Sequence, residues 1–212
     1  MLFDNFESIN EFIDDNKNSE QRNCEFKSAN SWEGDFRMKI TRAIMCMANK
    51  KNGGSIIIGV DENKDESTFT INGLDETMTS SYNGDEVMQF VNDKYADPSV
   101  SLTLQKIKIK NTDTNLINIH VSEFDSIPIT CKKDFNDILK TGALYSRSFS
   151  KQECSSSLSS EELREIIDLA KDKAIKNEIE HLKKIGVIPS LEQTVHDVSS
   201  DEDKFSEEAN GF

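Results

Sequence analysis

The feature that most constrains the fold is an unbroken apolar run, SIIIGV, at residues 55–60. A run of this length is typical of a strand covered on both faces of a sheet, since an exposed face would need polar residues at alternate positions. The segment before it has apolar residues at helical spacing: Phe36, Ile40, Ala43, Ile44 and Met47. Gly53 and Gly54 stop this helix and open a tight turn. The sequence therefore predicts a buried central strand that directly follows a helix.

The remaining segments predict an α/β (α+β) fold with a mixed β-sheet, packed helices and a long C-terminal helix. We expect a short helix at 8–16, strands at 24–29, 55–60, 67–74, 100–110, 114–123 and 141–148, and helices at 35–51, 83–98 and about 160–184. The strand at 67–74 is expected to form a hairpin with the central strand. The SSEE sequence that opens the last helix is similar to a capping box.

Two of these strands carry more detailed expectations. In 100–110, Leu102 and Leu104 have the opposite parity to Ile107 and Ile109, which predicts a β-bulge near Gln105–Lys106. In 114–123, the alternation places three apolar residues inward (Ile117, Ile119 and Val121) and two polar residues outward (Asn118 and His120).

The segments divide into an N-terminal helix (1–17), a core domain (18–152), a C-terminal helix (153–188) and an acidic disordered tail (189–212). The four cysteines are widely spaced and include no CxxC pair, which disfavours a zinc site and favours a reducing, cytoplasmic location. No apolar run approaches membrane-spanning length, so we expect no membrane partner.

Charge is distributed unevenly along the chain. The net charge of −14 taken alone argues against a nucleic-acid partner. Residues 21–60, however, hold seven Lys and Arg against three acids, while residues 1–20 and 191–212 are strongly acidic. Basic patches therefore lie within acidic surroundings, and whole-chain charge says little about any one face.

The segment EQRNCEFK at residues 20–27 carries the first candidate site. Strand alternation places Glu25 and Lys27 on one face, a short loop can return Glu20 to that side, and Asp61 and Glu62 follow the central strand. Two carboxylates about 4 Å apart repel by roughly 4 kcal/mol at an effective dielectric of about 20, and a cation would relieve this repulsion. Carboxylate oxygens suit Mg²⁺ or Mn²⁺, and Lys27 could neutralise the same phosphodiester. The alternative is that these are ordinary surface acids.

Basic residues give a second candidate surface. The nucleic-acid-binding candidates are Arg37, Arg42, Lys50, Lys51, Lys106, Lys108 and Arg147. Lys106 and Lys108 share a face that could track a phosphate backbone, or they could protect an edge strand from aggregation. Arg147, beside Tyr145, could bind phosphate or be a plain surface residue. No GxxxxGK sequence is present, so an ATPase has no support.

Four motifs in order resemble the schlafen-type AlbA-like domain family. They are E-x4-EFK, a helix ending in AIMCMANKKNGG, the strand SIIIGVDE and the return INGLDE. The resemblance covers residues 18–152 and implies an AlbA/schlafen-like core that binds nucleic acid. In nuclease members of that family, acids on these motifs form a metal-dependent site that cleaves structured RNA such as tRNA. By motif match these acids are Glu20, Glu25 and Asp61, with Lys27 beside them and Glu62 as the alternative if the register differs by one.

The leading hypothesis is a metal-dependent endoribonuclease that uses Mg²⁺ or Mn²⁺, acts on tRNA-like RNA and takes part in antiphage defence. A second hypothesis is a non-catalytic DNA- or RNA-binding module or regulator. A third is an assembly adaptor, in which the last helix mediates a homo-oligomer or recruits a partner protein together with the acidic tail.

Overall fold

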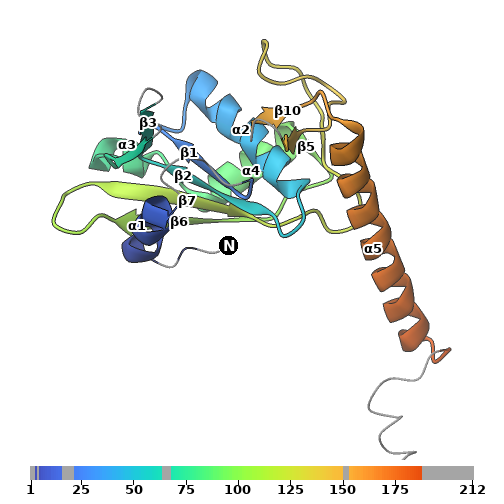
Figure 1. Cartoon of the computed structure of the whole chain (residues 1–212). Helices are drawn as coiled ribbons and strands as arrows, with labels where there is room; N and C mark the ends of the chain where they lie inside the picture. The colour runs from blue at the N-terminus through green and yellow to red at the C-terminus, as the bar shows by residue number, and fades with distance from the viewer. Residues whose placement is uncertain (1–2, 4, 16–21, 64–67, 150–152, 188–212) are drawn as a thin grey trace, which may run out of the picture. The chain divides into compact units, whose positions relative to one another are not determined.

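The computed structural model of the chain has a mixed α/β fold, as the sequence predicts, with helices on both faces of a four-stranded sheet (Figure 1). It describes residues 3, 5–15, 22–63, 68–149 and 153–187. The chain divides into two compact units, residues 1–170 and 171–212, and the sheet belongs to the first. The acidic segment 189–212, expected to be disordered, and Glu20 lie outside the described residues.

The strands of the central sheet lie in the order β1 (Cys24–Lys27), β2 (Gly54–Ile58), β7 (Asn115–Val121) and β6 (Leu102–Lys108). β1 and β2 are parallel, and the other neighbouring pairs are antiparallel. Ile56, Ile57 and Ile58 are completely buried. The apolar run is therefore a central strand covered on both faces, as predicted.

Two apolar layers bury this sheet, one on each face. Ile56 and Ile58 pack in the cluster that contains α2 (Gly34–Ala48) and α4 (Gly84–Lys94). Ile57 belongs to a second cluster formed with α1 (Phe6–Asp15). Figure 1 shows α2 and α1 on opposite sides of the sheet. Successive residues of β2 thus serve different layers, since side chains alternate across a strand.

The bulge predicted near Gln105–Lys106 is wrong. β6 pairs with β7 without interruption, from Leu102 opposite Val121 to Lys108 opposite Asn115. Leu102 packs in the α2 layer and Ile107 in the α1 layer. The change of parity needs no extra residue, because both faces of this sheet accept apolar side chains.

The outward position expected for Asn118 on β7 is also wrong, although Ile117, Ile119 and Val121 are buried as predicted. Asn118 is buried, and its side-chain amide donates to Gln105 Oε1 at 3.2 Å. The covered second face explains this burial, because a polar side chain there must find a partner within the protein.

The smaller pairings depart from the sequence expectations in two places. The segment predicted to pair with the central strand forms β4 (Thr68–Ile71), and it pairs instead with β3 (Val60–Asn63), the continuation beyond Gly59. The strand expected at 141–148 is reduced to β9 (Ser146–Arg147), which pairs with the unforeseen β10 (Cys154–Ser155). Three further short elements complete the fold: α3 (Glu76–Ser80), and the strands β5 (Ala96–Asp97) and β8 (Thr130–Cys131), which pair with each other.

Helix α5 (Ser160–Lys184) begins where the SSEE sequence predicts. The stripe expected along it was Leu163, Ile166, Ile167, Ala170, Ala174, Ile179 and Leu182. The structure buries Ile166 and also Leu169, but leaves Leu163, Ile167 and Ile179 exposed. Packing within the chain therefore explains only part of the stripe. Among the described residues, no helix combines the length and apolar character needed to cross a membrane.

Candidate carboxylate site and nucleic-acid interface

Glu25 is held in a buried network of charges. Its position on β1, opposite Ile56 of β2, turns it toward the α2 side of the sheet. It is 6% exposed, and its Oε2 lies 2.7 Å from Arg147 Nη1. Its Oε1 lies 2.6 Å from Lys27 Nζ, so Glu25 and Lys27 do share a face, as strand alternation predicts. Both oxygens of this carboxylate already contact cations.

Arg147 is buried, which excludes the plain surface residue that was one of its two interpretations. It is 1% exposed, and its guanidinium faces Glu25 rather than solvent. A second guanidinium nitrogen, Nη2, donates to the Cys24 carbonyl at 3.2 Å. In this structure Arg147 fixes the Glu25 carboxylate from β9, and its part in nucleic-acid binding stays a prediction.

Asn49, at the end of α2, holds the segment that carries Arg147. This buried side chain donates to the carbonyls of Ile129 (2.8 Å) and Tyr145 (2.9 Å) and accepts from the Ile129 backbone N–H (2.7 Å). All three bonds are to backbone groups, so the amide is well satisfied. Asn49, the first asparagine of the ANKKNGG motif, thus positions the segment that supplies Arg147.

The double glycine itself allows a close approach of chain segments. Gly53 has a positive φ of 64°, and a Cβ there would lie 2.0 Å from the Val121 carbonyl oxygen. A Cβ on Gly54 would lie 2.4 Å from Met47 Sδ and 2.8 Å from the Asn23 carbonyl oxygen. The turn from α2 into β2 therefore needs glycine at both positions, which is a structural reason for the motif.

Arg22 forms a second ion pair close to the first. Its guanidinium lies 2.7 and 3.4 Å from the two carboxylate oxygens of Glu165 on α5. The same group donates to the Arg147 carbonyl at 3.0 Å, and its central carbon lies 3.6 Å from the centre of the Phe149 ring. Neither Arg22 nor Glu165 nor Phe149 was a candidate from the sequence.

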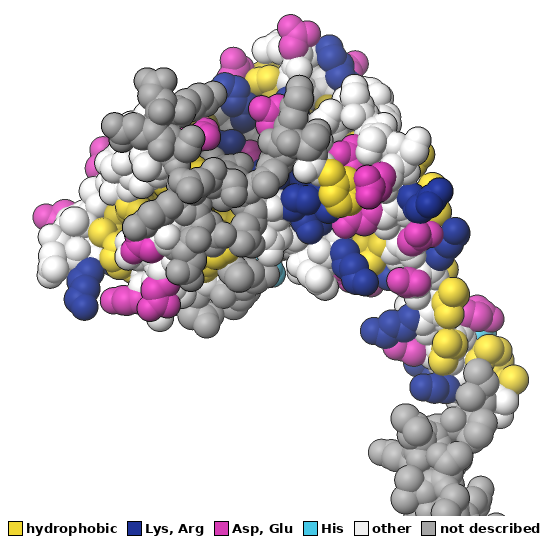
Figure 2. All heavy atoms as spheres, in the orientation of Figure 1, with side chains coloured by type: hydrophobic (Ala, Val, Ile, Leu, Met, Phe, Trp, Pro, Cys, Tyr) yellow, Lys and Arg dark blue, Asp and Glu magenta, His cyan; other side chains and the backbone are white. Residues whose placement is uncertain are grey.

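Lys50 completes this group of cations. Partial burial lowers the pKa of Lys50, and the positive charges of Arg22 and Arg147 lower it further, while the Glu165 carboxylate opposes them. No described carboxylate lies within ion-pair distance of Lys50. Figure 2 shows Lys and Arg side chains gathered beside the first turns of α5, adjoining acidic and hydrophobic side chains.

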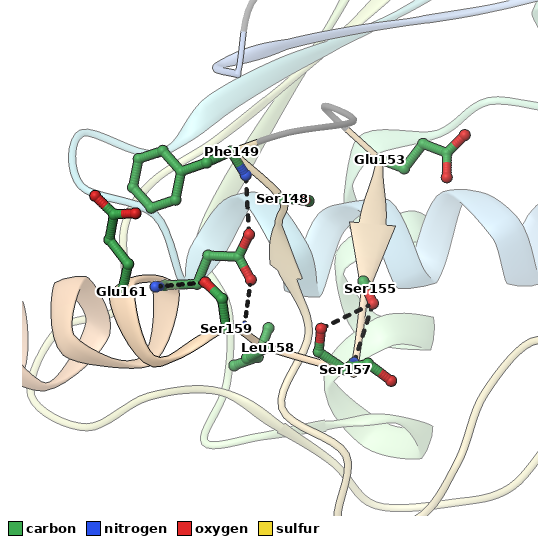
Figure 3. Close-up of a pocket in the computed structure, with 9 residues that line it drawn as sticks. Ser148, Phe149, Glu153, Ser155, Ser157, Leu158, Ser159 and Glu161 are labelled. Carbon is green, nitrogen blue, oxygen red and sulfur yellow. Dashed lines mark hydrogen bonds between the residues drawn. The ribbon is translucent and has the colours of Figure 1, made fainter.

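The beginning of α5 fixes the backbone at Phe149. Glu162 Oε1 accepts from the Phe149 N–H at 2.9 Å, and Oε2 accepts from the Ser159 N–H at 2.8 Å (Figure 3). Ser159 Oγ in turn accepts from the Glu162 N–H at 3.2 Å, so the predicted capping box is confirmed. These bonds lie beside a hollow of about 650 Å³ whose lining includes Phe149, Glu153 and Leu158.

Of the remaining carboxylates of the candidate site, the structure describes two, both on β3. Asp61 lies on β3, half-buried, and accepts a hydrogen bond from the Asn72 side chain, while Glu62 is exposed. Glu20 lies outside the described residues. Within the described part of the chain, no three His, Cys, Asp or Glu side chains form a group that could hold a metal ion. The three-acid site expected from the sequence therefore stays a prediction.

The other basic candidates are spread over the first unit. Arg37 is half-buried, with its guanidinium carbon 4.2 Å from the centre of the Phe90 ring, and Arg42 is also half-buried. Lys51, Lys106 and Lys108 are exposed, and the last two lie on β6, an edge strand of the sheet. Exposure and edge position fit both interpretations of these lysines, phosphate binding and edge protection.

The Schlafen, AlbA_2 family model matches residues 20–156, which is more than half of the chain. The chain therefore belongs to the Schlafen AlbA_2 family, as its motifs indicate. None of the curated proteins compared with the chain matches it.

Two solved structures are similar in fold. The DIP2311 protein of Corynebacterium diphtheriae is 17% identical with a TM-score of 0.41, over 63% of this chain and 22% of that one. The N-terminal domain of a RecG-related protein from Nitrosomonas europaea is 23% identical with a TM-score of 0.39, over 67% of this chain and 88% of that one. The family assignment comes from the family match, and these two structures add no argument to it.

Proposed function

We propose that this Schlafen-family chain acts on nucleic acid, as a metal-dependent endoribonuclease that cleaves structured RNA such as tRNA. The observation that carries the proposal is a carboxylate and an ammonium side by side on the motif strand, since Glu25 Oε1 and Lys27 Nζ lie 2.6 Å apart on one face. Family membership and the neighbouring cations Arg22 and Lys50 support a polyanionic ligand. Antiphage defence would be one setting for such an activity.

In this proposal Glu20, Glu25 and Asp61 would hold Mg²⁺ or Mn²⁺. Their oxygens are of the kind that these ions prefer, and Asn72 already orients the Asp61 carboxylate. An ionised carboxylate offers about four acceptor sites, so Glu25 Oε1 could accept a cation while Oε2 stays with Arg147. A bound ion would supply an activated water and positive charge at the phosphodiester. Lys27 would add its own charge beside the same oxyanion.

A second candidate function is a non-catalytic DNA- or RNA-binding module. The contacts of Glu25 favour it, because both carboxylate oxygens already contact cations, at 2.6 and 2.7 Å, as in a purely structural ion pair. In that case the cations would bind a nucleic-acid backbone, and the acids would serve the fold.

Asp61→Asn is the variant that separates these functions. It keeps an oxygen that can accept from Asn72, whereas Glu25→Ala removes the carboxylate that faces the buried Arg147 and would confound cleavage with folding. Glu62→Gln is the matched variant, since it removes one charge from the next residue of the same strand, and it also tests the alternative register in which Glu62 is the ligand. Wild type and both variants are incubated with total tRNA and with DNA, with Mn²⁺ or with a chelator.

We expect wild type to cut tRNA with Mn²⁺ and to be inactive with the chelator. Asp61→Asn should be slower by about 100-fold or more, since even residues that only support metal ligands contribute about 10–100-fold. Glu62→Gln should cut like wild type. Salt-sensitive binding without cutting would leave the binding module as the function. If the protein neither binds nor cuts nucleic acid, both candidate functions are excluded.

A further inference from the structure

The ion pair between Arg22 and Glu165 has a geometry suited to exchange of its anion. The carboxylate approaches the two terminal guanidinium nitrogens at 2.7 and 3.4 Å, a two-point approach that a phosphate can also make. The two side chains keep 19% and 27% of their exposure, so solvent and ligands can reach the pair. This differs from the closed pair of Arg147 and Glu25, in which both side chains are buried.

Cations outnumber their ion-pair partners around this pair. Arg22, Lys27, Lys50 and Arg147 contribute cations, and Glu25 and Glu165 are the carboxylates paired with them, while Glu162 is engaged with the backbone N–H groups of Phe149 and Ser159. Lys27 and Arg147 are committed to Glu25, whereas Lys50 has no ion-pair partner among the described residues. Burial lowers the pKa of Lys50, and repulsion by Arg22 and Arg147 lowers it further; an additional anion would offset that repulsion.

An aromatic surface adjoins the cations. Phe149 is 42% exposed although Arg22 covers one part of its ring, and its backbone is fixed by the hydrogen bond to Glu162. An exposed ring beside a guanidinium is the combination on which an unpaired base stacks while its phosphate is held.

We infer that Arg22, Lys50 and Phe149 form a subsite for one backbone phosphate and an adjacent unpaired base, and that Glu165 occupies the phosphate position when nucleic acid is absent. This inference rests on the proposed nucleic-acid function and assigns a particular subsite to it. The carboxylate of α5 then competes with the ligand, so that it keeps Arg22 oriented and lowers its affinity for phosphate. Loss of the carboxylate charge should therefore strengthen binding.

The test compares Glu165→Gln with Glu161→Gln, Lys50→Gln and the double variant Arg22→Ala/Glu165→Gln. Glu161 is exposed one turn earlier on the same helix and lines the same hollow as Phe149, but the ion pair of Arg22 is with Glu165, so the Glu161 variant removes the same charge and leaves that pair in place. Affinity for a single-stranded RNA oligonucleotide is measured in chelator over a series of salt concentrations. Thermal unfolding of each variant is recorded in parallel, with and without inorganic tripolyphosphate.

We expect Glu165→Gln to bind the RNA about two- to fivefold more tightly, the affinity equivalent of an exposed ion pair. Lys50→Gln should weaken binding and reduce the slope of log affinity against log salt by about 0.7. Glu165→Gln should confer no gain when Arg22 is replaced, because the gain acts through Arg22. Glu161→Gln should change affinity less than Glu165→Gln.

Different failures have different meanings. If RNA binds but Glu165→Gln and Glu161→Gln behave alike, the subsite is wrong while the nucleic-acid function stands. If RNA does not bind, but tripolyphosphate stabilises Glu165→Gln more than Glu161→Gln and stabilises Lys50→Gln least, the subsite stands and the nucleic-acid function falls. If neither probe distinguishes the variants, the inference is overturned.

Discussion

Two neighbouring ion pairs in this protein have the same chemistry and different surroundings. Arg147 and Glu25 join at 2.7 Å with both side chains buried. Arg22 and Glu165 join at the same 2.7 Å, but both side chains remain partly exposed. The Arg147 backbone carbonyl accepts from Arg22 at 3.0 Å, so the pairs are directly linked. The Arg147–Glu25 pair, called the inner pair below, orients a carboxylate. The Arg22–Glu165 pair, called the outer pair, can exchange its anion.

Burial is what separates the two roles. Removing one partner of a buried pair leaves a charge that water cannot reach, while removing one partner of an exposed pair leaves a charge that water can solvate. The inner pair is therefore part of the fold around β1, and the outer pair is available to a ligand.

The largest difference in stability between the two pairs is expected when Glu25 is removed. Glu25→Ala should lower the free energy of unfolding by about 3–5 kcal/mol, because it removes the carboxylate that faces a buried guanidinium. Glu165→Ala should lower it by only about 0–1 kcal/mol. Urea unfolding followed by circular dichroism measures both values. Similar losses in the two variants would show that burial does not distinguish the pairs.

The next effect concerns the residue that holds Arg147 in place. Asn49→Ala should lower the free energy of unfolding by about 2–3 kcal/mol, since it leaves backbone groups of Ile129 and Tyr145 without their buried partner. The same urea titration measures it. A loss below about 0.5 kcal/mol, the size of an ordinary surface substitution, would mean that Asn49 does not fix this segment.

The sequence predicts the position of Glu25 in the inner pair, but not its pairing with Arg147. Alternation along EFK placed Glu25 and Lys27 together, and the apolar run gave the central strand, because both are local patterns. The parity change in β6 led to the wrong prediction of a bulge, because the local pattern does not reveal that α1 covers the second face of the sheet. Asn49 left a signal, a polar residue at the end of the apolar helix IMCMAN, but not its partners.

The outer pair could not be predicted from local pattern. Arg22 and Glu165 are 143 residues apart, and Glu165 resembles any other acid on a polar helix. Arg22 lies two residues before β1, yet nothing in its neighbourhood indicates a contact with Phe149. Such pairs depend on how α5 packs, and Ile166 and Leu169 alone gave little guidance on its register.

A smaller effect on stability should distinguish Glu162 from Glu165, two acids of α5, by its dependence on pH. Burial by itself would raise the pKa of Glu162, but hydrogen bonds from the Ser159 and Phe149 backbone and from the Ser148 and Ser159 hydroxyls outweigh it and lower the pKa below its ordinary value of 4.5. A lowered folded-state pKa stabilises the fold above the ordinary value, and this stabilisation is lost as pH falls through the folded-state pKa.

Glu162→Gln should therefore be less stable than wild type by about 1 kcal/mol near pH 7, the usual value of a helix cap. The difference should shrink as pH falls below about 4.5. Glu165→Gln serves as the comparison on the same helix. Unfolding measured from pH 3 to pH 7 checks this, and a difference that does not vary with pH would refute the role of the Glu162 carboxylate.

The smallest effect is expected on the second unit. Ile175 and Ile179 of α5 are exposed, so replacing both with Glu should change the free energy of unfolding by no more than about 0.5 kcal/mol. Urea unfolding at two protein concentrations and a sizing column check this. A loss of stability that depends on concentration, with later elution, would instead show that this stripe joins copies of the chain.

The most direct measurement of the central proposal is the number of Mn²⁺ ions bound per chain, counted by electron paramagnetic resonance in wild type, Asp61→Asn and Glu62→Gln. If the acids of the two motif segments gather around one cation, wild type and Glu62→Gln bind one tight ion and Asp61→Asn binds none. No tight ion in wild type, or one that Asp61→Asn retains, would contradict the proposal and leave Glu25 as a structural partner of Arg147.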